Sequence, residues 1–167
     1  MEENNRLFIG AEIGRSSQSS QSSQVLVRDM ERRDLGKIAE LESICFDDPF
    51  SLQTVTALFE EGGVNLVLED PTGIQAYLMC SIREATGEIT TVATRPEKRR
   101  LGYARALFNN LLLELSKRDI SWVRLEVRTD NLNAIRLYES LGFRKIGVAR
   151  AYYEDGKDAF VMSMARR

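Results

Sequence analysis

Hydrophobic and polar residues recur along this chain with two periods, one of about 3.6 residues and one of two residues. In the first half, apolar residues at helical spacing predict helices over residues 34–46, with Asp34 as the expected N-cap, and from Ser51 to residue 61. Short apolar runs bounded by turn-forming residues predict strands. These strands cover residues 25–28, 64–69, 74–82 and 88–94. The last three are expected to form an antiparallel meander.

The second half of the chain continues the same alternation. Its predicted elements are a helix from about Tyr103 to Lys117, a strand at 122–127, a helix at 131–142, and strands at 144–153 and 158–164. Gly142 is the expected C-terminal glycine of the second helix. Helices interleaved with strands predict an α/β fold, with a mixed, mostly antiparallel central sheet and helices on both faces.

Residues 1–24 differ in composition from the rest of the chain. The stretch RSSQSSQSSQ, residues 15–24, is polar and of low complexity. Such a segment buries too little apolar surface to offset the entropy of ordering it, which predicts a disordered extension. The domain is therefore expected to cover residues 25–167, a length that suits one fold with its own core.

Composition excludes several classes of protein. The chain contains no histidine, which rules out an imidazole base, a Ser-His-Asp triad and a His-containing zinc site. Cys45 and Cys80 lie in apolar runs without metal-ligand spacing, so we expect buried free thiols, no metal and a cytoplasmic location. No apolar run approaches the ~20 residues that span a bilayer. A net charge of −2 argues against a general nucleic-acid-binding protein.

A cluster of basic residues nevertheless precedes the helix that is expected to begin at Tyr103. Residues 95–105 contain five Lys or Arg residues and a Gly-x-Ala step. A helix N-terminus has unpaired N–H groups and partial positive charge, and Gly102 allows a ligand to approach the backbone. The stretch therefore predicts a phosphate or pyrophosphate site, with a solvated basic turn as the alternative.

Three segments resemble the GNAT acetyltransferase superfamily. RRLGYA matches its Q/R-x-x-G-x-G/A motif, LEVRTDNLNAIRLYESLGF at 125–143 matches the region downstream, and YYEDGKDAFVM matches its C-terminal hairpin. The resemblance covers about residues 25–165 and is strongest to the RimI family, which acetylates the N-terminal alanine of ribosomal protein bS18. It implies the GNAT fold, acetyl-CoA as cosubstrate and the bS18 N-terminus as partner, without nucleic-acid or membrane binding.

The resemblance also implies which residues bind the coenzyme. The pyrophosphate would be held, mainly through backbone N–H groups, by Arg99, Arg100, Leu101, Gly102, Tyr103, Ala104 and Arg105. The backbone of Val92, Ala93 and Thr94 would pair with the pantetheine arm. Asn131 matches a coenzyme contact, and it is also placed to cap the helix that follows it.

A catalytic pair is implied in the same way. In the strand WVRLEVR, Arg124, Glu126 and Arg128 share one face, which predicts either a wet cleft or a solvated edge. The resemblance makes Glu126 the general base and Tyr138 the general acid. From the helical pattern alone, Tyr138 is expected to be a core residue.

The acceptor is expected to contact Phe50, Tyr152 and Tyr153. Phe50 stands where many RimI-like enzymes have Trp, so the sequence departs from the family beside the peptide groove. Three alternatives remain open: an acetyltransferase for a small amine or a lysine side chain, a non-catalytic coenzyme A-binding module, and a nucleic-acid-binding domain. Cys80 as a nucleophile is disfavoured, because its strand is apolar.

Overall fold

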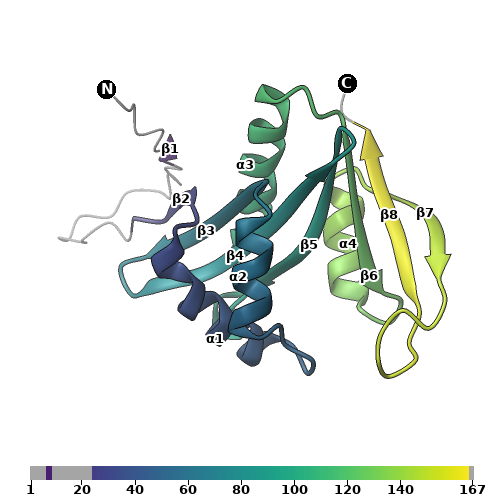
Figure 1. The fold of residues 1–167 in the computed structure, drawn as a ribbon, viewed down its shortest axis with the longest axis horizontal. Coiled ribbons are helices and arrows are strands. Elements are labelled where there is room, and N and C mark those ends of the chain that lie inside the picture. The colour runs from purple at the N-terminus through teal and green to yellow at the C-terminus, as the bar shows by residue number, and fades with distance from the viewer. Residues whose placement is uncertain (1–6, 9–23, 166–167) are drawn as a thin grey trace, which may run out of the picture.

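The computed structural model describes residues 7–8 and 24–165 of the chain, which form one eight-stranded sheet with helices on both faces (Figure 1). The strands are β1 Leu7–Phe8, β2 Leu26–Asp29, β3 Val64–Asp70, β4 Gly73–Arg83, β5 Thr86–Thr94, β6 Trp122–Arg128, β7 Arg144–Ala149 and β8 Ala159–Ala165. The helices are α1 Leu35–Cys45, α2 Leu52–Glu60, α3 Tyr103–Lys117 and α4 Leu132–Ser140, with short 3-10 turns η1 Arg32–Asp34 and η2 Pro96–Lys98. The strand order is β1-β2-β3-β4-β5-β6-β8-β7, which confirms the expected α/β class.

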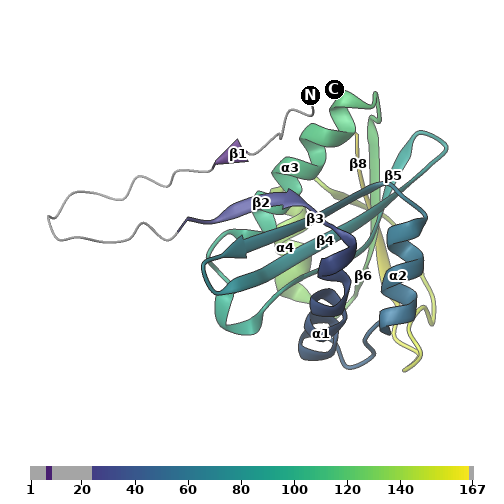
Figure 2. The same cartoon turned by 60° about the vertical axis from the view of Figure 1, so that its left-hand side comes forward.

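Two apolar clusters hold the layers together. Helices α1 and α2 pack on one face of the sheet around buried Ile38, Val55 and Tyr77. Helices α3 and α4 pack on the other face around buried Phe108 and Ile135. Figures 1 and 2 show this arrangement from two directions, with the sheet between the two helix pairs.

The predicted meander is confirmed, because β3, β4 and β5 pair in antiparallel succession. Strand β5 contains a bulge at Thr90, since Met79 of β4 pairs with Thr91 and Cys80 pairs with Ile89. Across the bulge, side chains change face: Ile89 belongs to the α3–α4 side, and Thr91 bonds to a residue of α1. The bulge therefore changes which residues of β5 face each helical layer.

Strands β5 and β6 separate along part of their length. The two strands pair in parallel only from Thr86↔Trp122 to Ile89↔Leu125. Beyond these residues they diverge, and α4 is seen between them in Figure 1. Backbone groups of β5 after Ile89 therefore lie on an edge that β6 does not pair.

Several local expectations need correction. The Asp34 side chain does not cap α1, because its carboxylate accepts hydrogen bonds from Arg28 and from the Glu31 N–H instead. Cys45 is half-buried rather than buried. The Ser51 cap is confirmed, with the Thr54 N–H donating to its hydroxyl at 3.1 Å.

The last predicted hairpin also differs from the structure. Strand β7 ends at Ala149, four residues earlier than expected, and a loop covers residues 150–158. Asp158 accepts hydrogen bonds from Arg150 and from the Ala151 N–H, and Ala151 has a φ of 47°. This bend ends the strand and places Tyr152 and Tyr153 in the loop.

The N-terminal prediction falls mostly on residues outside the described ones. Within that extension, Leu7–Phe8 forms β1, which pairs antiparallel with Leu26 and Val27 of β2. In the described ranges, 7–8 and 24–165, no helix is long and apolar enough to span a membrane.

Candidate active site

Strand β6 separates charged and apolar side chains as its alternation predicts. Val123, Leu125 and Val127 are buried in the layer of α3 and α4. Glu126 therefore projects from the opposite face, where Arg124 donates to its Oε1 through Nη2 at 2.8 Å and Nε at 3.1 Å. The Glu126 side chain is 22% exposed, so it is held in place and remains accessible.

Tyr138 approaches from the other side of the sheet. It lies in α4, with its ring centroid 5.6 Å from that of Phe108 and 6.0 Å from that of Phe143. Burial raises the pKa of its phenol, and the neighbouring phenol of Tyr153 raises it further. Tyr138 is thus a core residue whose hydroxyl stays protonated over the neutral pH range.

The loop between β7 and β8 carries two tyrosines, and one of them packs against Arg128 of β6. The rings of Tyr152 and Tyr153 meet edge to face, with centroids 5.1 Å apart. The guanidinium of Arg128 lies 4.7 Å from the Tyr153 ring centroid and also bonds to Asp155 of the loop. Arg128 therefore fastens this loop to β6.

The pKa values of both tyrosines are raised, mainly by burial. Burial and the neighbouring Tyr152 raise the pKa of Tyr153 to about 12, and the Glu126 carboxylate contributes to the same shift. Burial and then Glu126 raise the pKa of Tyr152. The phenol of Tyr153 in turn contributes to the raised pKa of Tyr138.

The turn before α3 has the geometry of an anion cradle. Arg100 and Gly102 both have left-handed backbones, with φ of 67° and 82°, and the Ala106 N–H makes the bond to the Gly102 carbonyl. In the described part of the chain, no side chain caps this helix end. Apart from Gly102 itself and its two neighbours in the chain, no atom of the described residues lies within 4 Å of the position that a Cβ on Gly102 would occupy. Unpaired N–H groups around open space fit the pyrophosphate of acetyl-CoA.

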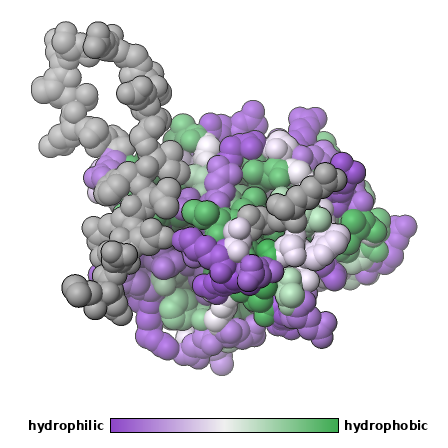
Figure 3. Space-filling model, turned by 90° about the horizontal axis from the view of Figure 1, so that it is seen from above, coloured by the Kyte–Doolittle hydropathy of each residue, from purple (hydrophilic) through white to green (hydrophobic). Residues whose placement is uncertain are grey.

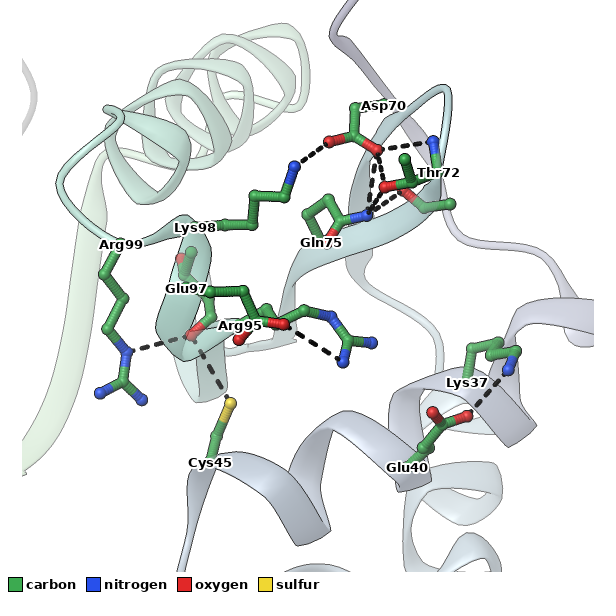
Figure 4. A network of polar contacts seen from close by, with 12 residues as sticks. Lys37, Glu40, Cys45, Asp70, Thr72, Gln75, Arg95, Glu97, Lys98 and Arg99 are labelled. Carbon is green, nitrogen blue, oxygen red and sulfur yellow. Dashed lines mark hydrogen bonds and ion pairs between the residues drawn. The ribbon is translucent and has the colours of Figure 1, made fainter.

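Most of the basic side chains bind protein groups, which the sequence pattern does not reveal. Lys98 donates to the buried Asp70 at 2.8 Å, and Arg99 donates through Nε to the Thr94 carbonyl at 3.1 Å (Figure 4). Arg105 donates to the Ser140 hydroxyl of α4 at 2.8 Å. These contacts hold the cradle in position relative to β3, β5 and α4.

The end of β5, which is expected to pair with the pantetheine arm, is hydrogen-bonded to β4 along one edge. Val92 pairs with Leu78, Ala93 with Tyr77 and Thr94 with Ala76. The Cys45 thiol and Arg99 both donate to the Thr94 carbonyl (Figure 4). The Thr94 hydroxyl oxygen is buried and has no hydrogen-bond partner among the described residues, which suits a strand end that accepts a further polar ligand.

Asn131 has the capping role that its position in the sequence predicts. Its Oδ1 accepts a hydrogen bond from the Ala134 N–H at 3.2 Å, at the start of α4. This contact fixes the N-terminal end of the helix that carries Tyr138. The contact with the coenzyme expected for Asn131 remains a prediction.

Glu42 is the residue of this region that the sequence analysis overlooked. It is 2% exposed and accepts hydrogen bonds from the Tyr77 hydroxyl, from the Thr91 hydroxyl at 2.7 Å and from the Phe50 N–H at 3.0 Å. These donors belong to β4, β5 and the α1–α2 loop. A signal was present, because Glu42 shares a helical face with Leu35 and Ile38.

The comparisons with known proteins agree with this geometry. The model of the acetyltransferase (GNAT) family matches residues 34–143. The [ribosomal protein bS18]-alanine N-acetyltransferase of Escherichia coli is 32% identical over 141 residues, covering 83% of this chain and 95% of that protein. The crystal structure of the E. coli ribosomal-protein-S18-alanine N-acetyltransferase has a TM-score of 0.79 at 31% identity, covering 84% of this chain and 93% of the other.

A second solved structure supports the fold alone. Ard1 from Thermoplasma volcanium has a TM-score of 0.82 at 23% identity, covering 86% of this chain and 98% of the other. The family model and the relatives cover most of the chain, including the cradle, β6 and α4. The chain belongs to the GNAT family and is an acetyl-CoA-dependent N-acetyltransferase.

Proposed function

We propose that the protein acetylates the α-amino group of a protein N-terminus, with the N-terminal alanine of ribosomal protein bS18 as its main acceptor. Transfer is direct, with Glu126 as the base and Tyr138 as the acid. Acetyl-CoA supplies the acetyl group as a thioester. The cradle and the end of β5 orient it, through Arg99–Arg105, Val92–Thr94 and Asn131.

One observation carries this proposal. Glu126 projects from β6 on one face of the sheet, just past the last residue that pairs with β5, and Tyr138 lies in the layer on the other face. A base and an acid in these positions would lie on the two sides of a reaction centre between the strands. A coenzyme-binding module would have no need for such a pair.

Each of the two residues has a defined task. Glu126 takes a proton from the incoming amine, directly or through one water molecule, so that the nitrogen lone pair becomes available. Tyr138 holds a proton on its hydroxyl and donates it to the departing sulfur. An α-amine has a pKa near ~8, against ~10.4 for lysine, so a carboxylate can deprotonate it near neutral pH.

The surroundings of Glu126 favour a peptide acceptor over a small free amine. Tyr152 and Tyr153 lie in the loop that Arg128 fastens to β6, and the Phe50 loop is fixed to the sheet by Glu42. Aromatic side chains on both sides of the acceptor fit a peptide backbone better than a polyamine. The E. coli relative is itself named for the alanine of bS18.

The test is a set of matched acceptors incubated with acetyl-CoA and followed by mass spectrometry. We expect acetylation of an Ala-initiated peptide with the bS18 N-terminal sequence. The same peptide with a blocked α-amine and a free lysine should react poorly, as should a polyamine. Preferential acetylation of the lysine or the polyamine would overturn the assignment of the acceptor.

A further inference from the structure

A hollow of about 460 Å³ lies on the face of the sheet from which Arg124 and Glu126 project. It lies where β5 and β6 are still paired, and Glu88, Trp122 and Arg124 are among its lining residues. Ile146 of β7 lines its outer side. In Figure 1 this end of β5 and β6 is the upper one.

The hollow combines large apolar side chains with charged ones. Trp122 is 55% exposed and Ile146 is 65% exposed, so two large apolar groups face solvent there. Around them, Arg83 pairs with Glu88 at 3.6 Å. The molecule seen from above has hydrophilic and hydrophobic side chains interspersed (Figure 3). Such a mixed surface suits a chain with both polar backbone and apolar side chains.

Arg124 links the hollow to the proposed base. Arg124 lines the hollow and donates to Glu126 at 2.8 Å. Trp122 precedes Glu126 by four residues on β6, which places it about 13 Å away along the strand. An extended acceptor peptide advances by the same distance per residue as strand β6 does. With its first residue at Glu126, its fifth residue would therefore lie beside Trp122.

We propose that this hollow is a subsite for the fourth and fifth residues of the acceptor, which is an extended peptide with an apolar side chain at that point. The subsite rests on the proposed function, because it takes the acceptor amine to lie at Glu126. Both positive and negative side chains line the hollow. A polymer with charges of one sign therefore fits it less well than a peptide that contains polar and apolar groups.

A fluorescence experiment tests whether the acceptor peptide binds in the hollow, and it does not require catalysis. Trp122 is the only tryptophan in the chain, so intrinsic emission reports on the subsite alone. With coenzyme A present, a seven-residue Ala-initiated peptide with leucine at position five should shift the emission to shorter wavelengths, saturably. A three-residue peptide should leave the emission unchanged. Equal responses to both peptides, or a response to protein concentration without peptide, would overturn the subsite.

Kinetics provide a second readout. Trp122→Ala should lower kcat/KM for the seven-residue peptide about fivefold, which corresponds to about 1 kcal/mol, and leave the three-residue peptide within about twofold. Leu113→Ala, which removes an exposed side chain from α3, is the matched control. An equal loss for both peptides would overturn the subsite alone. Failure of the unmodified enzyme to acetylate either peptide would overturn the proposed function and the subsite with it.

Discussion

Glu42 gives the sharpest structural prediction, because its buried carboxylate joins β4, β5 and the loop that carries Phe50. In Glu42→Ala, the Phe50 N–H loses its acceptor. The Tyr77 and Thr91 hydroxyls lie 3.1 Å apart and can bond to each other. An unsatisfied buried donor costs about 1–3 kcal/mol, and the space left by the side chain adds to this. We expect a loss of about 2–4 kcal/mol in the free energy of unfolding.

Glu42→Gln should be much milder. The amide oxygen can accept from the Phe50 N–H, and the amide nitrogen can donate to the Tyr77 and Thr91 hydroxyls, which can reverse their direction. We expect a loss of about 1 kcal/mol, since neutral hydrogen bonds replace stronger ones to a carboxylate. The contrast between the two variants depends on the network itself.

Urea unfolding and peptide kinetics together test this reasoning. Glu42→Ala should raise KM for the acceptor peptide, because the Phe50 loop is no longer fixed, and should leave acetyl-CoA affinity nearly unchanged. Glu40→Ala, on the exposed side of the same helix, is the matched control and should change little. Equal unfolding free energies for Glu42→Ala and the wild type would refute the reasoning, as would equal losses in the Ala and Gln variants.

Three further predictions concern the cradle and the N-terminal extension. Gly102→Val should abolish acetyl-CoA binding by calorimetry, because a side chain would fill the cradle, whereas Gly62→Val has a similar φ of 83° in open space and should still bind. Asp70→Asn should weaken acetyl-CoA binding several-fold, because Lys98 loses its charged partner; unchanged affinity would show that this pair does not hold the cradle. A chain beginning at Gln24 should keep its kcat, and a large loss in a folded truncation would show that the extension reaches the site.

The elements with strong local signals could be predicted from the sequence. The helix expected from about Tyr103 to Lys117 has those bounds in the structure, since Gly102 begins it and apolar residues recur along one face. The C-terminal glycine Gly142 has a φ of 98°, as that role requires. In each case the signal lies within a few residues of the feature it predicts.

Features that depend on distant contacts could not be predicted. The contact between the Lys98 and Asp70 side chains joins residues 28 positions apart in the sequence, and no local pattern encodes it. The separation of β5 from β6 depends on where pairing stops, and the bulge at Thr90 appears only once β4 is in register. For the proposed catalytic pair, the sequence supplied the resemblance and the alternation of β6, whereas the position of Glu126 and Tyr138 on opposite faces is a property of the folded sheet.

The central claim is that Glu126 and Tyr138 move protons in opposite directions across one reaction centre. The most direct test is the pH dependence of kcat/KM for an Ala-initiated peptide with Glu126→Gln and Tyr138→Phe. We expect Glu126→Gln to lose roughly 10²–10⁴ in rate near neutral pH and to recover partly toward the amine pKa, near ~8. Tyr138→Phe should lose rate at every pH, because alkaline solution supplies no proton. Near-wild-type profiles for both variants would contradict the account and leave both side chains with structural roles only.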